Sequence, residues 1–271
     1  SDCSRLTGMS TYETIEFDVN AGVATLTFNR PEARNAISLK MREELPPVIK
    51  RVSTDSDIRA LIVTGKGGSF CAGGDIRDMG SIGGSVEVGR NRMRATGTLV
   101  QALASIDKPV IAAVDGPAYG AGFGWAMLAD FVLATPEARF CASFGRLGLS
   151  PDLGLHYTLP RLVGLARAKD LIFSAREVRA DEALEMGLVY RIVPADRIAD
   201  VAQEMADAFC NASPMAIGVS KVLLEQSFAM DLRQITEAEA QNQAICFASD
   251  YHADAVQRFL EKKPARFNWP H

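Results

Sequence analysis

The chain has 271 residues, 48% of them apolar and 23% charged, and these values are typical of a folded globular protein rather than a disordered, collagen-like or disulfide-stapled one. A chain of this length buries about three quarters of the surface that its unfolded form exposes, so its core needs neither a metal ion nor a disulfide. The formal net charge of -4 argues against the broad basic surface that binds nucleic acid or an anionic membrane.

The cysteines, the histidines and the N-terminal residues exclude further classes of protein. Five cysteines are widely spaced and form no C-x-x-C pair, which favours reduced thiols in a cytoplasmic protein. Three histidines without a paired Cys/His spacing argue against a zinc site, and the absence of a G-x-S-x-G sequence argues against a serine hydrolase. No apolar run reaches the ~18 residues of a membrane span, and residues 1–10 lack the parts of a signal peptide. We therefore begin the fold at Met9, a candidate start.

Strands are predicted from alternation and from short apolar runs. Residues 14–19 and 22–28 alternate in polarity and are joined by a turn at 20–22, so we expect a hairpin. Residues 58–64 and 109–114 are almost continuously apolar, as in strands that are buried on both faces. Further strands are predicted at residues 130–134, 139–142 and 188–193.

Helices are predicted where apolar residues recur at helical spacing or follow a capping residue. The first begins after the N-cap residue Ser38, runs to Val52 and is interrupted or reset by Pro46 and Pro47, because proline lacks an N–H and clashes with the preceding turn. Two more helices are predicted over residues 86–105 and from the glycines near residue 122 to residue 129.

The last quarter of the chain is predicted to be helical. Apolar residues over 198–224 recur at helical spacing, Pro214 suits the first turn of a helix, and Asp231 suits a cap. The pattern divides the chain into a mixed core over residues 9–195 and a helical region over residues 196–271.

Two glycine-rich segments, residues 65–75 and 116–122, each follow a predicted buried strand. Neither carries a nucleotide fingerprint, because Trp125 stands where G-x-G-x-x-G needs its last glycine and the first segment lacks the G-K-[S/T] of a P-loop. What remains is two backbone segments with few side chains, one at the start of a helix, where amide N–H groups are free. Such a pair can form an oxyanion hole, or the glycines can simply permit tight turns and close packing.

Four motifs occur in order along the chain: residues 29–36 (NRPEARNA), 70–76 (FCAGGDI), 108–116 (KPVIAAVDG) and 120–122 (GAG). Together they resemble the crotonase (enoyl-CoA hydratase/isomerase) superfamily, and the resemblance extends from about residue 12 to residue 269. It implies an α/β fold, a crotonase-type spiral of ββα units with a helical C-terminal trimerisation region. It also implies acyl-CoA substrates that carry coenzyme A themselves, no permanently bound cofactor, and a homotrimer or hexamer.

The resemblance assigns residues to a CoA-ester site in the core. It places the two oxyanion donors on the backbone amides of Gly74 and Ala121, which suits thioester chemistry because backbone donors need no titratable group. Phe144 and Trp125 are expected in the substrate pocket, although Trp125 also suits a core position. The positions expected to bind CoA are Ala33, Arg34, Cys71, Gly73, Asp75 and Ile76, together with Lys262 or Lys263 from the C-terminal helix of the same or a neighbouring subunit.

The resemblance also narrows the reaction. Hydratases of the superfamily use two glutamates, whose positions here are Gly124 and Phe144, so ordinary hydration lacks both carboxylates. Asp152 instead occupies the place of the single catalytic acid in the superfamily's enoyl-CoA isomerases, especially those of phenylacetate degradation. Its apolar neighbours in sequence would raise its pKa and make it a better base. Without the resemblance, an aspartate after Pro151 would more simply be a helix N-cap.

The resulting hypothesis is isomerisation by proton transfer. Asp152 removes a proton from the α carbon of the thioester, the amides of Gly74 and Ala121 hold the dienolate, and Asp152 returns the proton at the γ carbon. Three alternatives stay open: a hydratase that uses Asp152 alone, an aryl-CoA dehalogenase with Asp152 as nucleophile, and a noncatalytic CoA-ester- or RNA-binding homologue. The dehalogenases have a tryptophan where Phe144 stands, and the net charge disfavours RNA. The acyl group is not identified, since the length of the pocket depends on the loop around residues 78–94.

Overall fold

The computed structural model describes residues 12–80 and 85–270. The expectations about Met9 and about a signal peptide lie outside the described residues, as does part of the loop around residues 78–94. The four described cysteines are free thiols, as predicted. No helix in the described ranges is long and apolar enough to cross a membrane.

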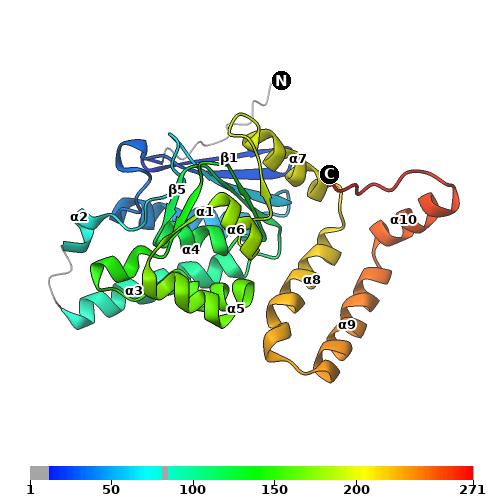
Figure 1. Ribbon diagram of the computed structural model, residues 1–271. Coiled ribbons are helices and arrows are strands. Elements are labelled where there is room, and N and C mark those ends of the chain that lie inside the picture. Colours follow the sequence, from blue (N-terminus) through cyan, green and yellow to red (C-terminus); the bar gives the residue numbers. More distant parts are fainter. Residues whose placement is uncertain (1–11, 81–84, 271) are drawn as a thin grey trace, which may run out of the picture.

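A six-stranded sheet forms the centre of the molecule (Figure 1). Its strand order is β1-β2-β3-β4-β6-β9, in which β1 and β2 form the predicted antiparallel hairpin and the other neighbours run parallel. The strands are β1 (Ile15–Asn20), β2 (Val23–Phe28), β3 (Ala60–Gly65), β4 (Val110–Val114), β6 (Phe131–Ala134) and β9 (Arg191–Ile192). These strands confirm the predicted ones, except that the run at 188–193 contributes only two residues.

A second sheet of three short strands has the order β5-β7-β8: β5 (Pro117–Tyr119), β7 (Arg139–Cys141) and β8 (Glu177–Arg179). The chain alternates between the sheets, because β4 and β6 belong to the large one and β5 and β7, which follow them, belong to the small one. Cys71 extends the small sheet through a parallel bridge to Ala118. Strands β5 and β8 were not predicted, because β5 lies inside the glycine-rich segment 116–122 and β8 has a single apolar residue, Val178.

Helices follow most of these strands, and both predicted N-caps, Ser38 and Asp231, are confirmed. Ser38, Ser213 and Asp231 each accept a hydrogen bond from a backbone N–H of the helix that follows, and Pro214 lies in the first turn of α8. The helices are α1 (Leu39–Thr54), α2 (Ile76–Met79), α3 (Val86–Ala104), α4 (Ala121–Met127), α5 (Leu155–Ser174), α6 (Ala180–Met186), α7 (Ile198–Cys210), α8 (Pro214–Gln226), α9 (Leu232–Phe247) and α10 (Asp250–Leu260), with short 3-10 turns η1 (Pro31–Ala33), η3 (Ser143–Leu147) and η4 (Ser227–Ala229).

The predicted interruption of the first helix is wrong. Helix α1 continues through Pro46 and Pro47 to Thr54. Both prolines lie on the exposed face, where the carbonyl groups that lose their N–H partners can reach water. The opposite face of α1 is fully buried at Leu45 and Ile49, so core packing holds the helix where local propensity disfavours it.

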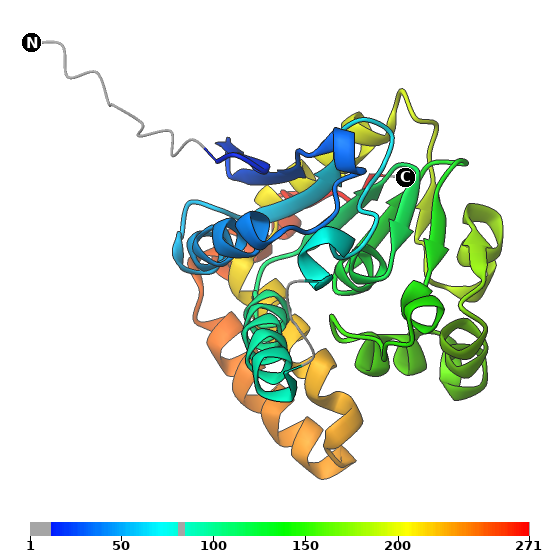
Figure 2. The same cartoon turned by 90° about the vertical axis from the view of Figure 1, so that its left-hand side faces the viewer.

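The central strands are buried on both faces, as predicted. In β3, Leu61 and Val63 join the main core with α1, whereas Ala60 and Ile62 face the other way and pack with α7. Helix α3 packs beside α1 (Figure 2). Residues of α1 and α3 that face each other therefore meet, although about fifty positions separate them in sequence.

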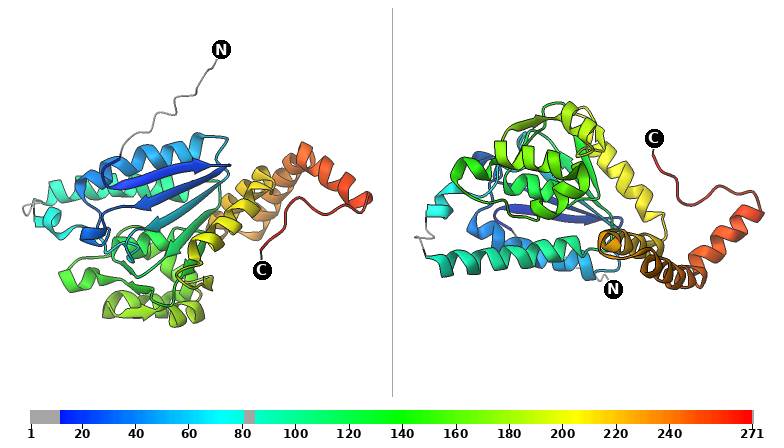
Figure 3. Two further views of the ribbon diagram at one scale, coloured as in Figure 1. Left: turned by 90° about the horizontal axis from the view of Figure 1, so that it is seen from above. Right: turned by 60° about the horizontal axis from the view of Figure 1, so that its bottom comes forward.

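The predicted boundary after residue 195 has to be moved, because α7 packs on the large sheet and belongs to the core. Only α8, α9 and α10 project from the core as an arm (Figures 1 and 3). The chain then returns, and its last described residues pack on the core beside α7. There they join an aromatic cluster that anchors the far end of the arm. The cluster consists of Phe131, Tyr190, Phe209, Phe267 and Trp269.

Candidate active site

The two glycine-rich segments lie side by side. The backbone N–H of Cys71 donates to the carbonyl of Pro117 at 3.0 Å, and the N–H of Tyr119 donates to the carbonyl of Cys71 at 2.9 Å. The glycines are required for this approach: a Cβ on Gly122 would lie 2.2 Å from the Cys71 carbonyl oxygen, and Gly73 has a φ of +102°. From the sequence, the glycines could serve either close packing or an oxyanion hole. In this arrangement the two roles are compatible.

The amides of Gly74 and Ala121 come from these two segments. On either side of Gly74, Ile37 donates to the carbonyl of Gly73 and Asp75 donates to the carbonyl of Ile37, so the N–H of Gly74 is left out of this pairing. Ala121 is the first residue of α4, where an N–H has no acceptor within the helix. Neither N–H donates to a backbone oxygen within the described ranges.

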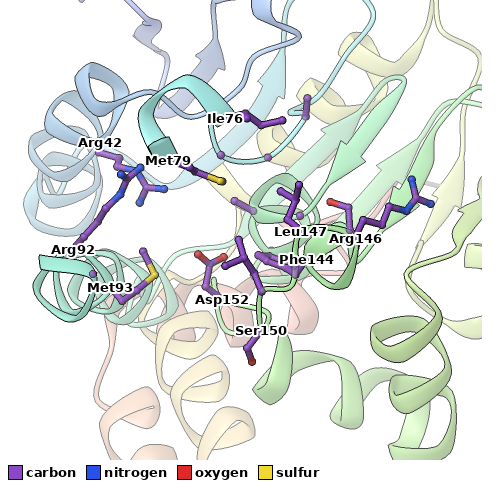
Figure 4. Close-up of a pocket in the computed structure, with 18 residues that line it drawn as sticks. Arg42, Ile76, Met79, Arg92, Met93, Phe144, Arg146, Leu147, Ser150 and Asp152 are labelled. Carbon is purple, nitrogen blue, oxygen red and sulfur yellow. The ribbon is translucent and has the colours of Figure 1, made fainter. Parts of the chain in front are cut away.

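Both residues line a cavity of about 550 Å³ (Figure 4). Its wall is mainly apolar, and Asp152 is its only carboxylate among the described residues. The lining residues are Arg42, Ala72, Gly73, Gly74, Ile76, Met79, Gly89, Arg92, Met93, Gly120, Ala121, Ser143, Phe144, Arg146, Leu147, Leu149, Ser150 and Asp152. The cavity therefore combines two backbone donors, one carboxyl group and an apolar lining.

Asp152 points into this cavity (Figure 4). Its Oδ1 is buried and has no hydrogen-bond partner in the described structure. Burial raises the pKa of Asp152, and the positive charges of Arg42 and Arg92 oppose that shift in part. The alternative in which Asp152 caps a helix is wrong, because α5 begins at Leu155 with Gly154 as its N-cap. The Asp152 side chain is thus free for another role.

The positions of the two missing glutamates are filled differently. A Cβ built on Gly124 would lie 2.3 Å from the Cβ of Leu153, so no side chain fits at that position without displacing the residue next to Asp152. Phe144 is 8% exposed and forms part of the cavity wall. The cavity thus has no second carboxylate at either position, and at Gly124 it has no room for one.

Two of the positions expected to bind CoA reach the cavity wall, and the other core positions adjoin them along the backbone. Gly73 and Ile76 line the cavity, and the carbonyl of Arg34 accepts a hydrogen bond from the N–H of Ala72 at 2.9 Å. Ala33 ends the turn η1 just before Arg34, whose side chain is exposed. These backbone segments are therefore neighbours, and their role in binding CoA stays a prediction.

The side chains of two of these positions serve the structure. Arg77 and Arg30 hold the carboxylate of Asp75 and lower its pKa to about 2, so that side chain is occupied. The thiol of Cys71 is buried, and burial raises its pKa to about 12, which suits packing rather than reactivity. No group of three His, Cys, Asp or Glu side chains in residues 12–80 and 85–270 could hold a metal ion.

Two predicted site residues lie elsewhere. Trp125 is 2% exposed, packs edge-on against Phe28 in the core and does not line the cavity, because its direction on α4 is inward. Lys262 is exposed after the end of α10, and it does not line the cavity of its own chain.

Sequence reasoning missed Arg42 and Arg92, which lie on one side of the cavity (Figure 4). Arg42 adjoins the buried Met41 on α1, and Arg92 lies one turn before the buried Thr96 on α3. A charged residue at the margin of a buried helix face was the available signal, but it is also typical of surface residues.

Comparison with known proteins gives one consistent picture. The family model described as enoyl-CoA hydratase/isomerase matches residues 18–269. The chain is 35% identical to the Escherichia coli protein named 1,2-epoxyphenylacetyl-CoA isomerase, over 92% of this chain and 96% of that one. It is 36% identical to the short-chain-enoyl-CoA hydratase of Clostridium acetobutylicum, over 89% and 92% of the two chains.

A solved structure agrees with these matches. The crystal structure of an enoyl-CoA hydratase/isomerase from Cupriavidus metallidurans CH34 superposes with a TM-score of 0.92 at 37% identity, covering 96% of this chain and 98% of that one. Similarity over nearly the whole length confirms the fold class that the four motifs imply.

We predict that Gly124→Ala lowers kcat/KM for an enoyl-CoA ester on the order of tenfold to a hundredfold, because the added methyl group displaces Leu153 and the adjoining Asp152. The same crowding lowers the free energy of unfolding by about 1–3 kcal/mol. Gly97→Ala in α3 is the matched control, since a Cβ there meets nothing within 4 Å, and it should unfold at a higher temperature. Steady-state kinetics and thermal unfolding measure both effects, and full turnover in Gly124→Ala would contradict this explanation.

Proposed function

The chain belongs to the enoyl-CoA hydratase/isomerase family, whose members act on CoA thioesters, and from this premise we propose that it is an isomerase that moves a double bond in an enoyl-CoA. The observation that carries the proposal is the single buried carboxyl group of Asp152 in a cavity that also contains Gly74 and Ala121. Proton transfer between two carbons needs one base, whereas ordinary hydration in this superfamily uses two carboxylates.

In the proposed reaction, the carboxylate of Asp152 accepts a proton from the α carbon of a β,γ-unsaturated thioester. The electron pair of that C–H bond moves into a dienolate, and the amides of Gly74 and Ala121 hold the oxygen on which negative charge develops. Asp152 then returns the proton to the γ carbon, which leaves the double bond between the α and β carbons. Each backbone donor contributes about 2.7–4 kcal/mol to lowering the barrier if it is positioned as in known oxyanion holes.

The proposed substrate is an enoyl-CoA derived from an aromatic ring, as in phenylacetate degradation. The relative named 1,2-epoxyphenylacetyl-CoA isomerase supports this class, and so do the apolar side chains Met79, Met93, Phe144 and Leu149 in the cavity wall. Relatives named hydratases have similar identity, so hydration by Asp152 alone is the competing activity to be measured.

We further propose that the chain assembles into a homotrimer or a hexamer through the arm of α8, α9 and α10. The arm and the segments joining its helices carry large apolar side chains that the single chain leaves between 61% and 83% exposed, and a second copy would cover them. They are Leu224, Phe228, Leu232, Phe247, Phe259 and Leu260. An assembly of this kind would also be the means of bringing Lys262 of one subunit to the CoA of another.

Asp152→Asn should lower the rate of double-bond migration by about 10²–10⁴-fold, because the amide cannot accept the α proton. Binding of a saturated acyl-CoA should be retained, since the amide keeps the shape of the carboxyl group. The rate is measured by the absorbance of the conjugated thioester, and water addition is followed in parallel by the mass of the product.

Asp18→Asn is the matched control, because Asp18 is an exposed aspartate on β1, outside the cavity wall, and this variant should behave as wild type. Isomerisation that survives in Asp152→Asn would refute the role of Asp152. A wild-type enzyme that adds water and never moves the double bond would refute the isomerase assignment itself.

The pH dependence follows from the raised pKa of Asp152. Its ionised form is the base, so kcat/KM should fall as pH falls through a midpoint above the ordinary aspartate value of about 3.9. The sign for stability is the opposite: ionisation is disfavoured in the folded state, so Asp152 should cost stability as pH rises from its unfolded to its folded pKa. Asp152→Asn should accordingly gain thermal stability over wild type across that interval and at higher pH. A midpoint at or below the ordinary value would contradict the burial effect.

The assembly proposal predicts a solution mass of three or six times the 29.2 kDa of one chain, measured by light scattering after size-exclusion chromatography. Phe259→Glu places a charge on the exposed apolar surface of α10 and should lower that mass. A wild-type mass equal to one chain would exclude both oligomers.

A further inference from the structure

Two arginines from different helices meet at one wall of the cavity. Arg42 on α1 and Arg92 on α3 point toward each other, and Asp152 lies across from them (Figure 4). Arg42 donates from Nη1 to the hydroxyl of Thr96 at 2.7 Å, and Arg92 donates from Nη1 to the backbone carbonyl of Asp78 at 3.0 Å. The Nε of each is buried and has no partner among the described residues. Both guanidinium groups therefore keep unused donors.

Neither guanidinium has an ion-pair partner within 4.0 Å in the described structure, which distinguishes them from the largely buried Arg30. Arg30 pairs with Asp75 at 3.0 Å, and Arg146 directs Nε and Nη2 to the carbonyl of Ala175. Burial and the charge of Arg92 together lower the pKa of Arg42. The charges of Asp152 and Asp78 oppose this shift only in part. Two like charges held this close together favour an anion in the cavity.

The place of this pair indicates which part of a substrate would meet it. Nη2 of Arg42 lies 3.9 Å from the point where a Cβ on Gly74 would stand, so it is close to the proposed oxyanion donor. The arginine wall is built by α1 and α3, whereas the expected CoA positions lie on residues 33–34 and 71–76. The acyl group, rather than the nucleotide of CoA, would then occupy the space beside the arginines.

Charge complementarity selects the chemistry of the acyl group. Among the described residues, Arg42, Arg92 and Arg146 line the cavity against a single carboxylate, Asp152, so its wall carries a net positive charge. Carboxylate geometry matches the planar fork of a guanidinium, which gives charge-assisted hydrogen bonds. We propose that Arg42 and Arg92 form a subsite for a carboxylate on the acyl group. Among the ring-derived enoyl-CoA esters of the proposed function, the preferred substrates are then those whose acyl group ends in a second carboxylate, which are CoA monothioesters of unsaturated dicarboxylic acids. The reaction of these substrates rests on the proposed function, whereas the binding of the carboxylate does not depend on it.

The first test measures binding alone, by calorimetry with two saturated acyl-CoA esters of equal chain length, one ending in a carboxylate and one in a methyl group. Wild type should bind the carboxylate ester about tenfold to a hundredfold more tightly. Arg92→Met should remove most of this preference, and Arg92→Lys should keep part of it, because lysine retains the charge without the fork. Arg94→Met is the matched control, since Arg94 is an exposed arginine on the same helix that does not line the cavity, and it should keep the preference.

Binding of the methyl ester by Arg92→Met shows that the variant is folded. Equal affinity of wild type for the two esters would overturn the subsite. So would an Arg92→Met variant that binds both esters and free CoA more weakly by the same factor, because the arginines would then bind the CoA part.

A second test repeats the comparison in turnover, with the matching β,γ-unsaturated esters. A carboxylate preference in binding together with water addition as the only reaction would leave the subsite standing and refute the isomerase. Double-bond migration at equal kcat/KM for both esters would refute the subsite and leave the isomerase standing.

Discussion

The backbone pairing of Cys71 with Pro117 and Tyr119 is the contact on which the rest of the site depends. It holds the two glycine-rich segments together, and thereby sets the amides of Gly74 and Ala121 on one cavity. Because these donors are backbone atoms, their geometry is inherited from strand pairing rather than from side-chain rotamers. Glycine at positions 73 and 122 is the steric condition for this approach. Glycine, which has no side chain, therefore leaves the room that the two segments need to approach each other.

Local signals predicted much of the fold. Ser38 and Asp231 cap helices because short polar side chains satisfy free N–H groups wherever they occur, and the apolar run that contains Leu61 is a buried strand. The same signals failed where tertiary packing outweighs them. Pro46 remains inside a helix whose other face is anchored in the core, and the strands β5 and β8 exist only through their neighbours.

The residues of the site also fall into two groups, those that the sequence could reveal and those that depend on tertiary packing. Asp152 and the two glycine motifs could be found because family motifs fix their place in the chain. The reason why Gly124 carries no side chain could not, since it depends on Leu153, which lies 29 positions away and contacts α4 only in the folded chain. Arg42 and Arg92 are likewise joined only by the packing of α1 against α3, and either alone resembles a surface arginine. Trp125 was misplaced because a motif gives the position of a residue but not the direction of its side chain.

The aromatic cluster gives the arm of α8, α9 and α10 a second attachment. One end of the arm continues from α7 and the other is held by Phe267 and Trp269, so the arm is a closed loop and not a free tail. Separating the C-terminal end of the arm from the core would expose these rings to solvent. Of the two tryptophans in the chain, Trp125 lies in the core and Trp269 lies in this aromatic cluster. Intrinsic fluorescence would thus distinguish release of the arm from unfolding of the core.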